Sequence, residues 1–179
     1  MTGTHREYTL WVTPAEPLKS TLKAAITKLY REFDAVDFDP HVTIYAGRSN
    51  DEEALRLGKM ISETFPPITL RAVRLEQSDA LTKTFYVQFE ESAGLRRMTD
   101  MLRSHSAQPS DYELNPHLSL LYQLFIDETV RKELCNRTDV APIGDYRFDG
   151  LTIYEMDIPL RDLNPIRTWR KVSEFKLGA

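Results

Sequence analysis

The sequence predicts an α+β fold of two similar lobes, each a largely antiparallel sheet with flanking helices. Segments with alternating apolar and polar residues, typical of strands, recur between segments with apolar residues at helical spacing. A phrase built around Pro-His occurs once in each half, as DPHVTI at 39–44 and NPHLSL at 115–120. No linker rich in Gly, Ser or Pro separates the halves, so we expect residues 1–179 to form a single bilobal domain.

The first half of the chain alternates strands and helices. Residues 7–13 alternate like a strand that stops at Pro14, and 18–33 carry apolar residues at helical spacing. The first Pro-His phrase predicts a strand at about 41–46. A second helix is expected at 51–65, where acidic residues occupy the first turn and two prolines follow.

The second half continues this order. Residues 68–77 and 84–90 alternate on either side of a short connection, which predicts an antiparallel pair of strands. A helix at 92–104 and the second Pro-His strand follow. The remaining elements that the pattern predicts are a helix at 127–137 and strands at 146–157 and 170–177. Because each half contains a helix, a Pro-His strand, another helix and further strands, we interpret the halves as products of a duplication.

Composition narrows the classes of function. The chain has 179 residues, 41% of them hydrophobic and 28% charged, with a net charge of −4. No stretch approaches the roughly 20 apolar residues that span a bilayer, and the N-terminus lacks the apolar core of a signal peptide, so we expect a cytoplasmic protein without a membrane partner. The acidic balance disfavours broad electrostatic binding to long nucleic acid. The single cysteine, Cys135, excludes an intrachain disulfide and is expected to be a packed core thiol.

The repeated phrase has a geometric meaning. Because side chains alternate across a strand, His41 and Thr43 share one face, and the same holds for His117 and Ser119. The apolar residues between them point to the core. The proline before each histidine fixes φ and lacks an N–H, so it marks the start of the strand. Each half therefore presents one imidazole and one hydroxyl on the same face.

This set of groups suits phosphodiester chemistry without a metal. Histidine titrates near pH 6.5, so one copy can accept a proton while the other donates one. The two hydroxyls can donate hydrogen bonds to phosphate oxygens. A single histidine after proline is more often structural, but two of the four histidines occur in matching contexts. The other two, His5 and His105, lack this context and are expected to be surface residues.

The two phrases carry a family resemblance. HVTI at 41–44 and HLSL at 117–120 match the paired HxTx and HxSx signatures of the 2H phosphoesterase superfamily. The length, the early segment TLWVTP and the continuation of HLSLLY to Tyr122 most resemble the cyclic phosphodiesterases of plants and yeast within it. The resemblance implies a two-lobed α+β protein whose histidine motifs face each other across a central cleft.

The resemblance also implies an activity. It is the hydrolysis of a nucleoside 2′,3′-cyclic phosphate to a 2′-phosphate, or of ADP-ribose 1″,2″-cyclic phosphate to ADP-ribose 1″-phosphate. His41 and His117 would be the catalytic acid and base, in an order that the sequence leaves open, and Thr43 and Ser119 would bind the phosphate. We expect no cofactor and no metal. The expected partner is a small cyclic-phosphate nucleotide, with RNA ends as a further substrate, and the expected state is a monomer.

Aromatic residues are candidates for holding the nucleobase or closing the cleft, because stacking contributes about 1 to 3 kcal/mol per base. The resemblance supports Trp11 and Tyr122. Tyr45 has the same strand parity as the first motif, and Tyr86 lies on a predicted central strand, but both are equally compatible with core or rim positions.

Three alternatives remain at this point. The first is another activity of the superfamily, as an RNA 2′,3′-cyclic phosphodiesterase or a 2′,5′-phosphodiester ligase or hydrolase, which the acidic balance modestly disfavours. The second is a non-catalytic module that binds a phosphorylated nucleotide, which the intact histidines and hydroxyls disfavour. The third is a structural or metal-binding histidine pair, but two ligands alone make a poor zinc site.

Overall fold

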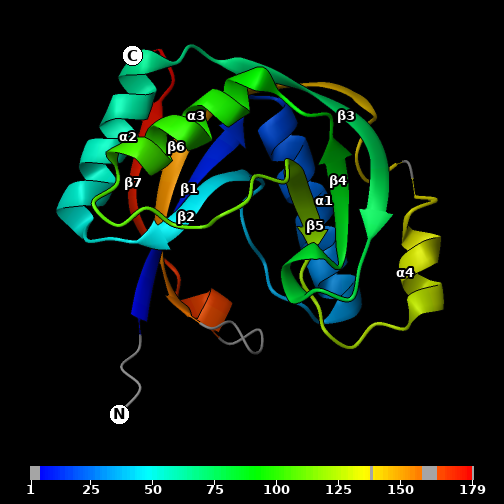
Figure 1. The fold of residues 1–179 in the computed structure, drawn as a ribbon. Coiled ribbons are helices and arrows are strands. Elements are labelled where there is room, and N and C mark those ends of the chain that lie inside the picture. The colour runs from blue at the N-terminus through cyan, green and yellow to red at the C-terminus, as the bar shows by residue number, and fades with distance from the viewer. Residues whose placement is uncertain (1–4, 138, 159–164, 179) are drawn as a thin grey trace.

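The computed structural model describes residues 5–137, 139–158 and 165–178, which form alternating strands and helices (Figure 1). The strands are β1 (His5–Pro14), β2 (Val42–Arg48), β3 (Ile68–Gln77), β4 (Phe85–Phe89), β5 (His117–Leu121), β6 (Gly144–Ile158) and β7 (Arg170–Lys176). The helices are α1 (Leu18–Phe33), α2 (Asp51–Thr64), α3 (Ala93–His105) and α4 (Glu128–Leu134). Short 3₁₀ turns lie at Leu81–Lys83 and Pro165–Thr168. The α+β fold class is confirmed.

The observed elements follow the predicted ones closely. The helix predicted at 18–33 has these bounds in α1, and the strand predicted at 68–77 has them in β3. The largest difference is in α4, which ends at Leu134 although the pattern predicts a helix over 127–137. The last part of that prediction forms tight turns instead, because the N–H of Arg137 donates to the carbonyl three residues back rather than four.

Within the described residues, seven strands form one antiparallel sheet in the order β2-β1-β6-β3-β4-β5, with β7 paired to β6 off this path. The long strand β6 joins the two lobes. Its residues 144–148 pair with β3, while residues 148–158 pair with β1. Strand β7 pairs with residues 150–155 of β6, along the edge of β6 opposite to β1. The lobes are therefore two ends of a shared sheet rather than separate sheets.

A close approach of strands occurs in the middle of β6. A Cβ atom on Gly150 would clash with the Oγ1 of Thr13 on the neighbouring strand. Glycine at this position therefore allows β1 and β6 to meet closely. The pairing of β1 with β6 is irregular at the same point, between Thr13 and Pro14, where the sheet passes from one lobe to the other.

The helices link the halves crosswise. Helix α1, which precedes the first Pro-His strand, contacts β5, and α3, which precedes the second, contacts β2. Figure 1 shows α2 and α3 on the lobe of β1 and β2, and α1 behind β4 and β5. A buried hydrogen bond of 2.7 Å from Thr99 Oγ1 of α3 to the carbonyl of Ile44 in β2 strengthens the contact between α3 and β2. Each half thus completes the core of the other.

The core contains the residues that the helical spacing predicts. Helices α1, α2 and α3 each bury an apolar stripe. Two of these helices begin with a side-chain cap: Asn50 accepts from the N–H of Glu53, and Ser92 accepts from the N–H of Leu95. Cys135 is only half-buried against this core, with its thiol 3.7 Å from the carbonyl of Arg131.

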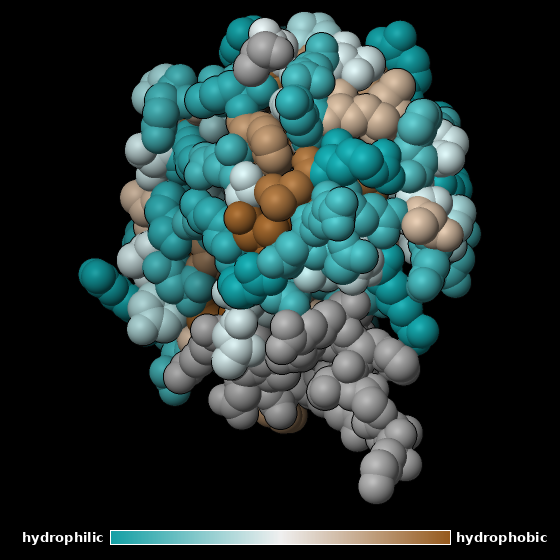
Figure 2. All heavy atoms as spheres, turned by 90° about the vertical axis from the view of Figure 1, so that its left-hand side faces the viewer, coloured by the Kyte–Doolittle hydropathy of each residue, from teal (hydrophilic) through white to brown (hydrophobic). Residues whose placement is uncertain are grey.

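The face of the molecule that contains α2 carries mainly polar side chains. Figure 2 shows the face on which α2 lies, where one small hydrophobic area is surrounded by hydrophilic residues. His105 is exposed at the end of α3, as predicted. The side chain of His5 lies outside the described residues. In the part of the chain that the structure describes, no helix combines the length and apolar character needed to cross a membrane.

Candidate active site

The two Pro-His phrases orient their histidines in the same way. The Nδ1 of His41 lies 2.6 Å from the carbonyl oxygen of Asp39, and the Nδ1 of His117 lies 2.7 Å from that of Asn115. A carbonyl oxygen only accepts, so Nδ1 carries the proton in both rings and donates it. Each carbonyl belongs to the residue before the proline, which proline keeps extended. The phrase therefore fixes the tautomer and leaves Nε2 of each imidazole unprotonated in the neutral ring.

The two phrases converge on one cavity of about 320 Å³. His41 and Thr43 from β2 line it together with His117 and Ser119 from β5. The strands contact each other without being paired in the sheet. The structure thus brings together all four residues that the motifs single out, with one imidazole and one hydroxyl from each lobe.

Burial separates the two imidazoles. His41 is 6% exposed, and burial lowers its pKa to about 4, with a further lowering by nearby His117 and an opposing contribution from its bond to Asp39. The pKa of His117 is also lowered, first by burial and then by the positive charge of Lys83, against the bond to the Asn115 carbonyl. His117 is less buried than His41. At neutral pH both rings are neutral, and His41 is the harder of the two to protonate.

The two hydroxyls also differ. Ser119 is buried, and its Oγ donates a hydrogen bond of 2.6 Å to the carbonyl oxygen of Thr82. Thr43 is half-buried, and among the described residues its Oγ1 has no hydrogen-bond partner. The backbone carbonyl of Thr43 accepts from the hydroxyl of Tyr112 at 2.9 Å. Thr43 is therefore free to donate into the cavity, whereas Ser119 must first release Thr82.

Trp11 lines the cavity, but both faces of its ring are covered. His41 stacks on one face at 3.5 Å between ring centroids, and Tyr154 stacks on the other at 4.3 Å. Trp169 meets the ring edge-on at 5.7 Å. Both stacking neighbours are protein rings, so Trp11 contacts a ligand in this cavity through its edge rather than through a ring face. The indole instead buries His41 and holds its ring.

Tyr122 is part of the cavity wall beside His41. It is 3% exposed, and its ring stacks on Phe38 at 3.8 Å between centroids. Its hydroxyl lies 3.4 Å from the Nε2 of His41. Burial raises the pKa of Tyr122, so the phenol keeps its proton and can donate it as a hydrogen bond to that nitrogen.

Tyr45 and Tyr86 lie outside the cavity. Adjacent residues of β1 pair with Thr43 and Tyr45 of β2, which are two residues apart. Ile44 is therefore the extra residue of a β-bulge. The bulge breaks the alternation and turns Tyr45 into the core. Tyr86 donates a 2.9 Å hydrogen bond to Glu76. Its ring meets that of a catalytic candidate, His117, edge-on at 5.6 Å, so it supports the imidazole without lining the cavity.

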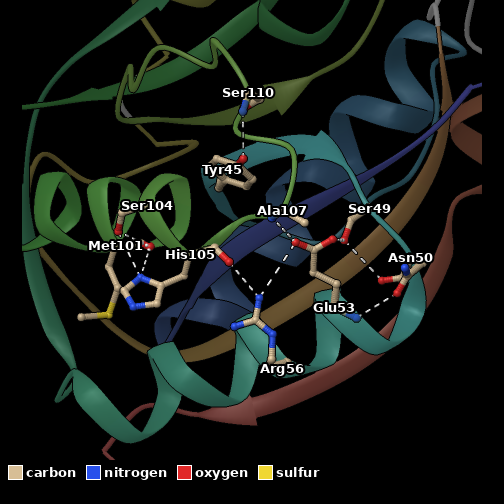
Figure 3. A network of polar contacts seen from close by, with 10 residues as sticks. All are labelled: Tyr45, Ser49, Asn50, Glu53, Arg56, Met101, Ser104, His105, Ala107 and Ser110. Atoms are coloured by element: carbon tan, nitrogen blue, oxygen red, sulfur yellow. Dashed lines mark hydrogen bonds and ion pairs between the residues drawn. The ribbon is translucent and has the colours of Figure 1, made fainter.

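The loop between α3 and β5 supplies a residue that the sequence pattern does not reveal. Figure 3 shows how the loop is attached to the other half: the N–H of Ala107 donates to Glu53, the carbonyl of His105 accepts from Arg56, and the N–H of Ser110 donates to the hydroxyl of Tyr45. These bonds measure 2.6, 2.8 and 3.1 Å.

The anchored loop places Tyr112 against the cavity. Two further lining residues, Glu7 and Thr9, alternate with Trp11 along β1, and this alternation is the only signal in the sequence that points to them. Met156 of β6 lies beside them. In the described ranges no group of three or more His, Cys, Asp or Glu residues is arranged to hold a metal ion.

Comparisons with known proteins identify the fold. No family model and no curated protein sequence matches the chain. The structure of E. coli LigT complexed with 3′-AMP has a TM-score of 0.60 and 14% identity, over 99% of this chain and 100% of LigT. TT0787 of Thermus thermophilus has a TM-score of 0.63 and 19% identity, over 97% of this chain and 98% of that protein. A protein described as a phosphoesterase has a TM-score of 0.56 and 13% identity, over 97% of this chain and 99% of that protein. The chain therefore has the fold of these proteins over nearly its whole length, in agreement with the α+β fold expected from the sequence.

Proposed function

We propose that this protein is a 2H phosphoesterase that hydrolyses a cyclic phosphodiester without a metal. The proposed substrate is a nucleoside 2′,3′-cyclic phosphate, which gives a 2′-phosphate, or ADP-ribose 1″,2″-cyclic phosphate, which gives ADP-ribose 1″-phosphate. The observation that carries the proposal is the matched orientation of His41 and His117, each with Nδ1 bound to a carbonyl and the ring lining the same cavity. Two Nε2 atoms in one cavity are what acid–base catalysis of a displacement at phosphorus requires.

The unequal burial of the histidines supports an assignment of roles. His41, with its pKa lowered to about 4, is neutral at physiological pH and serves as the base. It takes a proton from water as the water oxygen forms a bond to phosphorus. The bond from phosphorus to the 3′ oxygen breaks, and His117 gives its proton to that oxygen. The negative phosphate raises the pKa of the imidazole beside it, which favours protonation of the less buried His117.

The hydroxyls act on the phosphate. Thr43, whose Oγ1 has no partner in the described structure, donates to a phosphate oxygen that gains charge during the displacement. Ser119 does the same after releasing the carbonyl of Thr82. Tyr122, 3.4 Å from the Nε2 of His41, steers this nitrogen before water arrives. The structures of LigT with 3′-AMP, with phosphate and with ATP support a nucleotide phosphate as the ligand of this fold.

The test is hydrolysis of the four nucleoside 2′,3′-cyclic phosphates and of ADP-ribose 1″,2″-cyclic phosphate in EDTA, with the product identified by phosphorus NMR. The expected result is a 2′-phosphate, or a 1″-phosphate, that the His117→Ala protein no longer forms. Loss of turnover in EDTA that added metal restores would contradict the metal-independent mechanism. Binding of these compounds without turnover would favour a non-catalytic nucleotide-binding module.

A second candidate function is action on an RNA end, as a 2′,3′-cyclic phosphodiesterase or a 2′,5′-phosphodiester ligase or hydrolase. The observation that favours it is a groove of about 650 Å³ along α1, which ends at Asp39 and Pro40, next to the first histidine. Four basic residues line it: Lys19, Lys23, Lys28 and Arg31. Such a groove is able to follow a phosphate backbone.

The charges of the groove provide the test. Lys23 lies 3.1 Å from Asp37 and 3.2 Å from Asp39, which neutralises this end. Lys28 and Arg31 form no ion pair with any described residue. Replacing both by Glu should weaken hydrolysis of an oligonucleotide with a 2′,3′-cyclic end at least tenfold while mononucleotide turnover stays the same. Equal rates on the oligonucleotide would exclude this candidate.

A further inference from the structure

The cavity continues along β1 beyond the two histidines. Glu7, Thr9 and Trp11 occupy alternate positions of this strand and all line the cavity. Strand residues rise about 3.3 Å each, so the row from Trp11 to Glu7 extends about 13 Å. Trp11 is paired with Thr43 at the phosphate end. The row therefore leads from the reacting groups to a second end of the cavity, at a distance that suits the base of a bound nucleotide.

Two polar atoms of this row are buried without a partner. Thr9 is 5% exposed and Trp11 is 2% exposed, and neither the Thr9 hydroxyl nor the Trp11 indole N–H has a hydrogen bond in the described structure. Buried polar groups in folded proteins are nearly always satisfied, because an unpaired one destabilises the fold. Because both residues line the cavity, a ligand that reaches these two atoms would complete their hydrogen bonds.

The far end of the cavity is acidic. The carboxylate of Glu7 is half-buried and has no hydrogen bond or ion pair among the described residues. Burial raises the pKa of Glu7; Arg48 opposes this, and the nearby carboxylate of Asp111 adds to it. A second phosphate group would be repelled here, whereas a group that donates N–H bonds would be attracted. The cavity thus has a phosphate end and an end that attracts a hydrogen-bond donor.

The walls between these ends have the character of a slot for a flat ring. Ala46 is opposite Thr9 in the sheet, and Met156 is opposite Glu7 on the other side. Both line the cavity, as does Tyr112 on the anchored loop. A small residue on one strand leaves room for a ring, and the thioether and the phenol supply apolar contacts.

We infer that Glu7 and Thr9 form a nucleobase subsite that selects guanine. The inference rests on the proposed function, because it takes the phosphate of the same nucleotide to lie at the histidines. Guanine presents two parallel N–H donors, N1–H and the 2-amino group, to the two oxygens of a carboxylate. Thr9, whose hydroxyl both donates and accepts, binds a further polar atom of the ring edge.

The same geometry ranks the other bases. Adenine and cytosine offer an amino group but place an unprotonated ring nitrogen beside it, so only one bond to Glu7 forms. Uracil has a single N–H flanked by two carbonyl oxygens, which face the carboxylate unfavourably. The expected order of affinity is guanine first, adenine and cytosine next, and uracil last.

The experiment is equilibrium binding of the four nucleoside 2′-monophosphates, measured by calorimetry, to the wild-type protein, to two test variants and to a control variant for each. The wild type should bind guanosine 2′-phosphate at least about tenfold more tightly than uridine 2′-phosphate, as expected for a bidentate pair. Glu7→Gln should reduce this ratio to about twofold or less. Glu133→Gln, which removes an exposed carboxylate on α4 outside the cavity, is the matched control and should keep the ratio.

The second variant, Thr9→Val, removes only the hydroxyl and keeps the shape of the side chain. Since this hydroxyl has no partner in the described structure, the variant should be at least as stable as the wild type, while its affinity for guanosine 2′-phosphate falls about threefold or more. Ser106→Ala is the control, because Ser106 also has a buried hydroxyl without a described partner but does not line the cavity. It should leave the affinity unchanged.

The outcomes separate this inference from the proposed function. Equal affinities for the four nucleotides, or an unchanged ratio in Glu7→Gln, would overturn the guanine subsite even if every cyclic phosphate is hydrolysed. Selective guanine binding that depends on Glu7 would support the subsite even if no cyclic phosphate is turned over. A loss of stability in Thr9→Val with unchanged binding would assign Thr9 a purely structural role and also overturn the inference.

Discussion

The two Pro-His strands share one local pattern but have different surroundings. His41 is enclosed between the Trp11 ring and the hydroxyl of Tyr122, with 6% of its surface exposed. His117 is less buried, and its neighbours are the edge of Tyr86 and the ammonium group of Lys83. The repeat therefore sets the tautomer of each imidazole, while the tertiary environment sets how readily each one takes a proton.

The largest expected effect is loss of turnover when either histidine is removed. His41→Ala and His117→Ala should each reduce the rate of cyclic phosphate hydrolysis by at least about 100-fold, the usual contribution of a positioned acid or base. The double variant should cost little more than one single change, because the pair acts as a unit. Steady-state kinetics measures this. A His41→Ala protein with the parental rate would disprove the paired mechanism.

The next effect concerns stability against pH and separates the two histidines. In the unfolded chain His41 is protonated below about pH 6.5, whereas in the folded protein, where its pKa is about 4, it stays neutral down to about pH 4. Stability present at pH 7 should therefore be lost as the pH falls, by about 2 to 3 kcal/mol at pH 4.5 from this residue alone. Urea unfolding of the wild type and of His41→Gln at both pH values measures the difference. An equal loss in both proteins would contradict the buried neutral imidazole.

Removing the aromatic cover should make the two sites more alike. Trp11→Leu takes away the ring that buries His41, so the pKa of His41 should rise toward its ordinary value and the free energy of unfolding should fall by about 2 to 3 kcal/mol. Tyr86→Leu is the matched change beside His117 and should shift its imidazole less, because the ring meets it only at an edge. NMR titration of the histidines measures both shifts, and a larger shift in Tyr86→Leu would reverse the comparison.

The smallest effects are expected at the hydroxyls. Thr43→Ala should raise the activation free energy by roughly 1 to 3 kcal/mol with little change in stability, since its Oγ1 has no partner in the described residues. Ser119→Ala should lower both activity and stability, because it also leaves the buried bond to Thr82 unmade. Kinetics combined with thermal unfolding distinguishes the two. A stability loss in Thr43→Ala that matches Ser119→Ala would show that the hydroxyls are equivalent.

Much of this site is readable from local pattern. The alternation of side chains correctly placed His41 with Thr43 and His117 with Ser119, because parity is a property of any regular strand. The same parity does not extend to Tyr45, which packs in the core. A β-bulge at Ile44 restarts the alternation, and bulges depend on pairing with another strand rather than on the strand itself.

Other features depended on segments far apart in the chain. The rings that stack on Trp11 belong to His41 and Tyr154, which come from distant parts of the sequence. Tyr112 reaches the cavity only because its loop is bound to the opposite half. No local pattern encodes such contacts, since they depend on how the helices cross between the lobes.

The amino-acid sequence by itself determined the elements, their order and the doubled imidazole and hydroxyl motif, because hydrophobic period, prolines and strand parity act over a few residues. The tertiary structure decided that α1 and α3 exchange lobes and that the two motif strands meet at one cavity. It also made His41 the more buried imidazole, left the Thr9 hydroxyl without a described partner and placed Glu7 at the other end of the same cavity. Burial and the supply of hydrogen-bond partners are sums over the whole fold, so they exist only once distant residues have packed together.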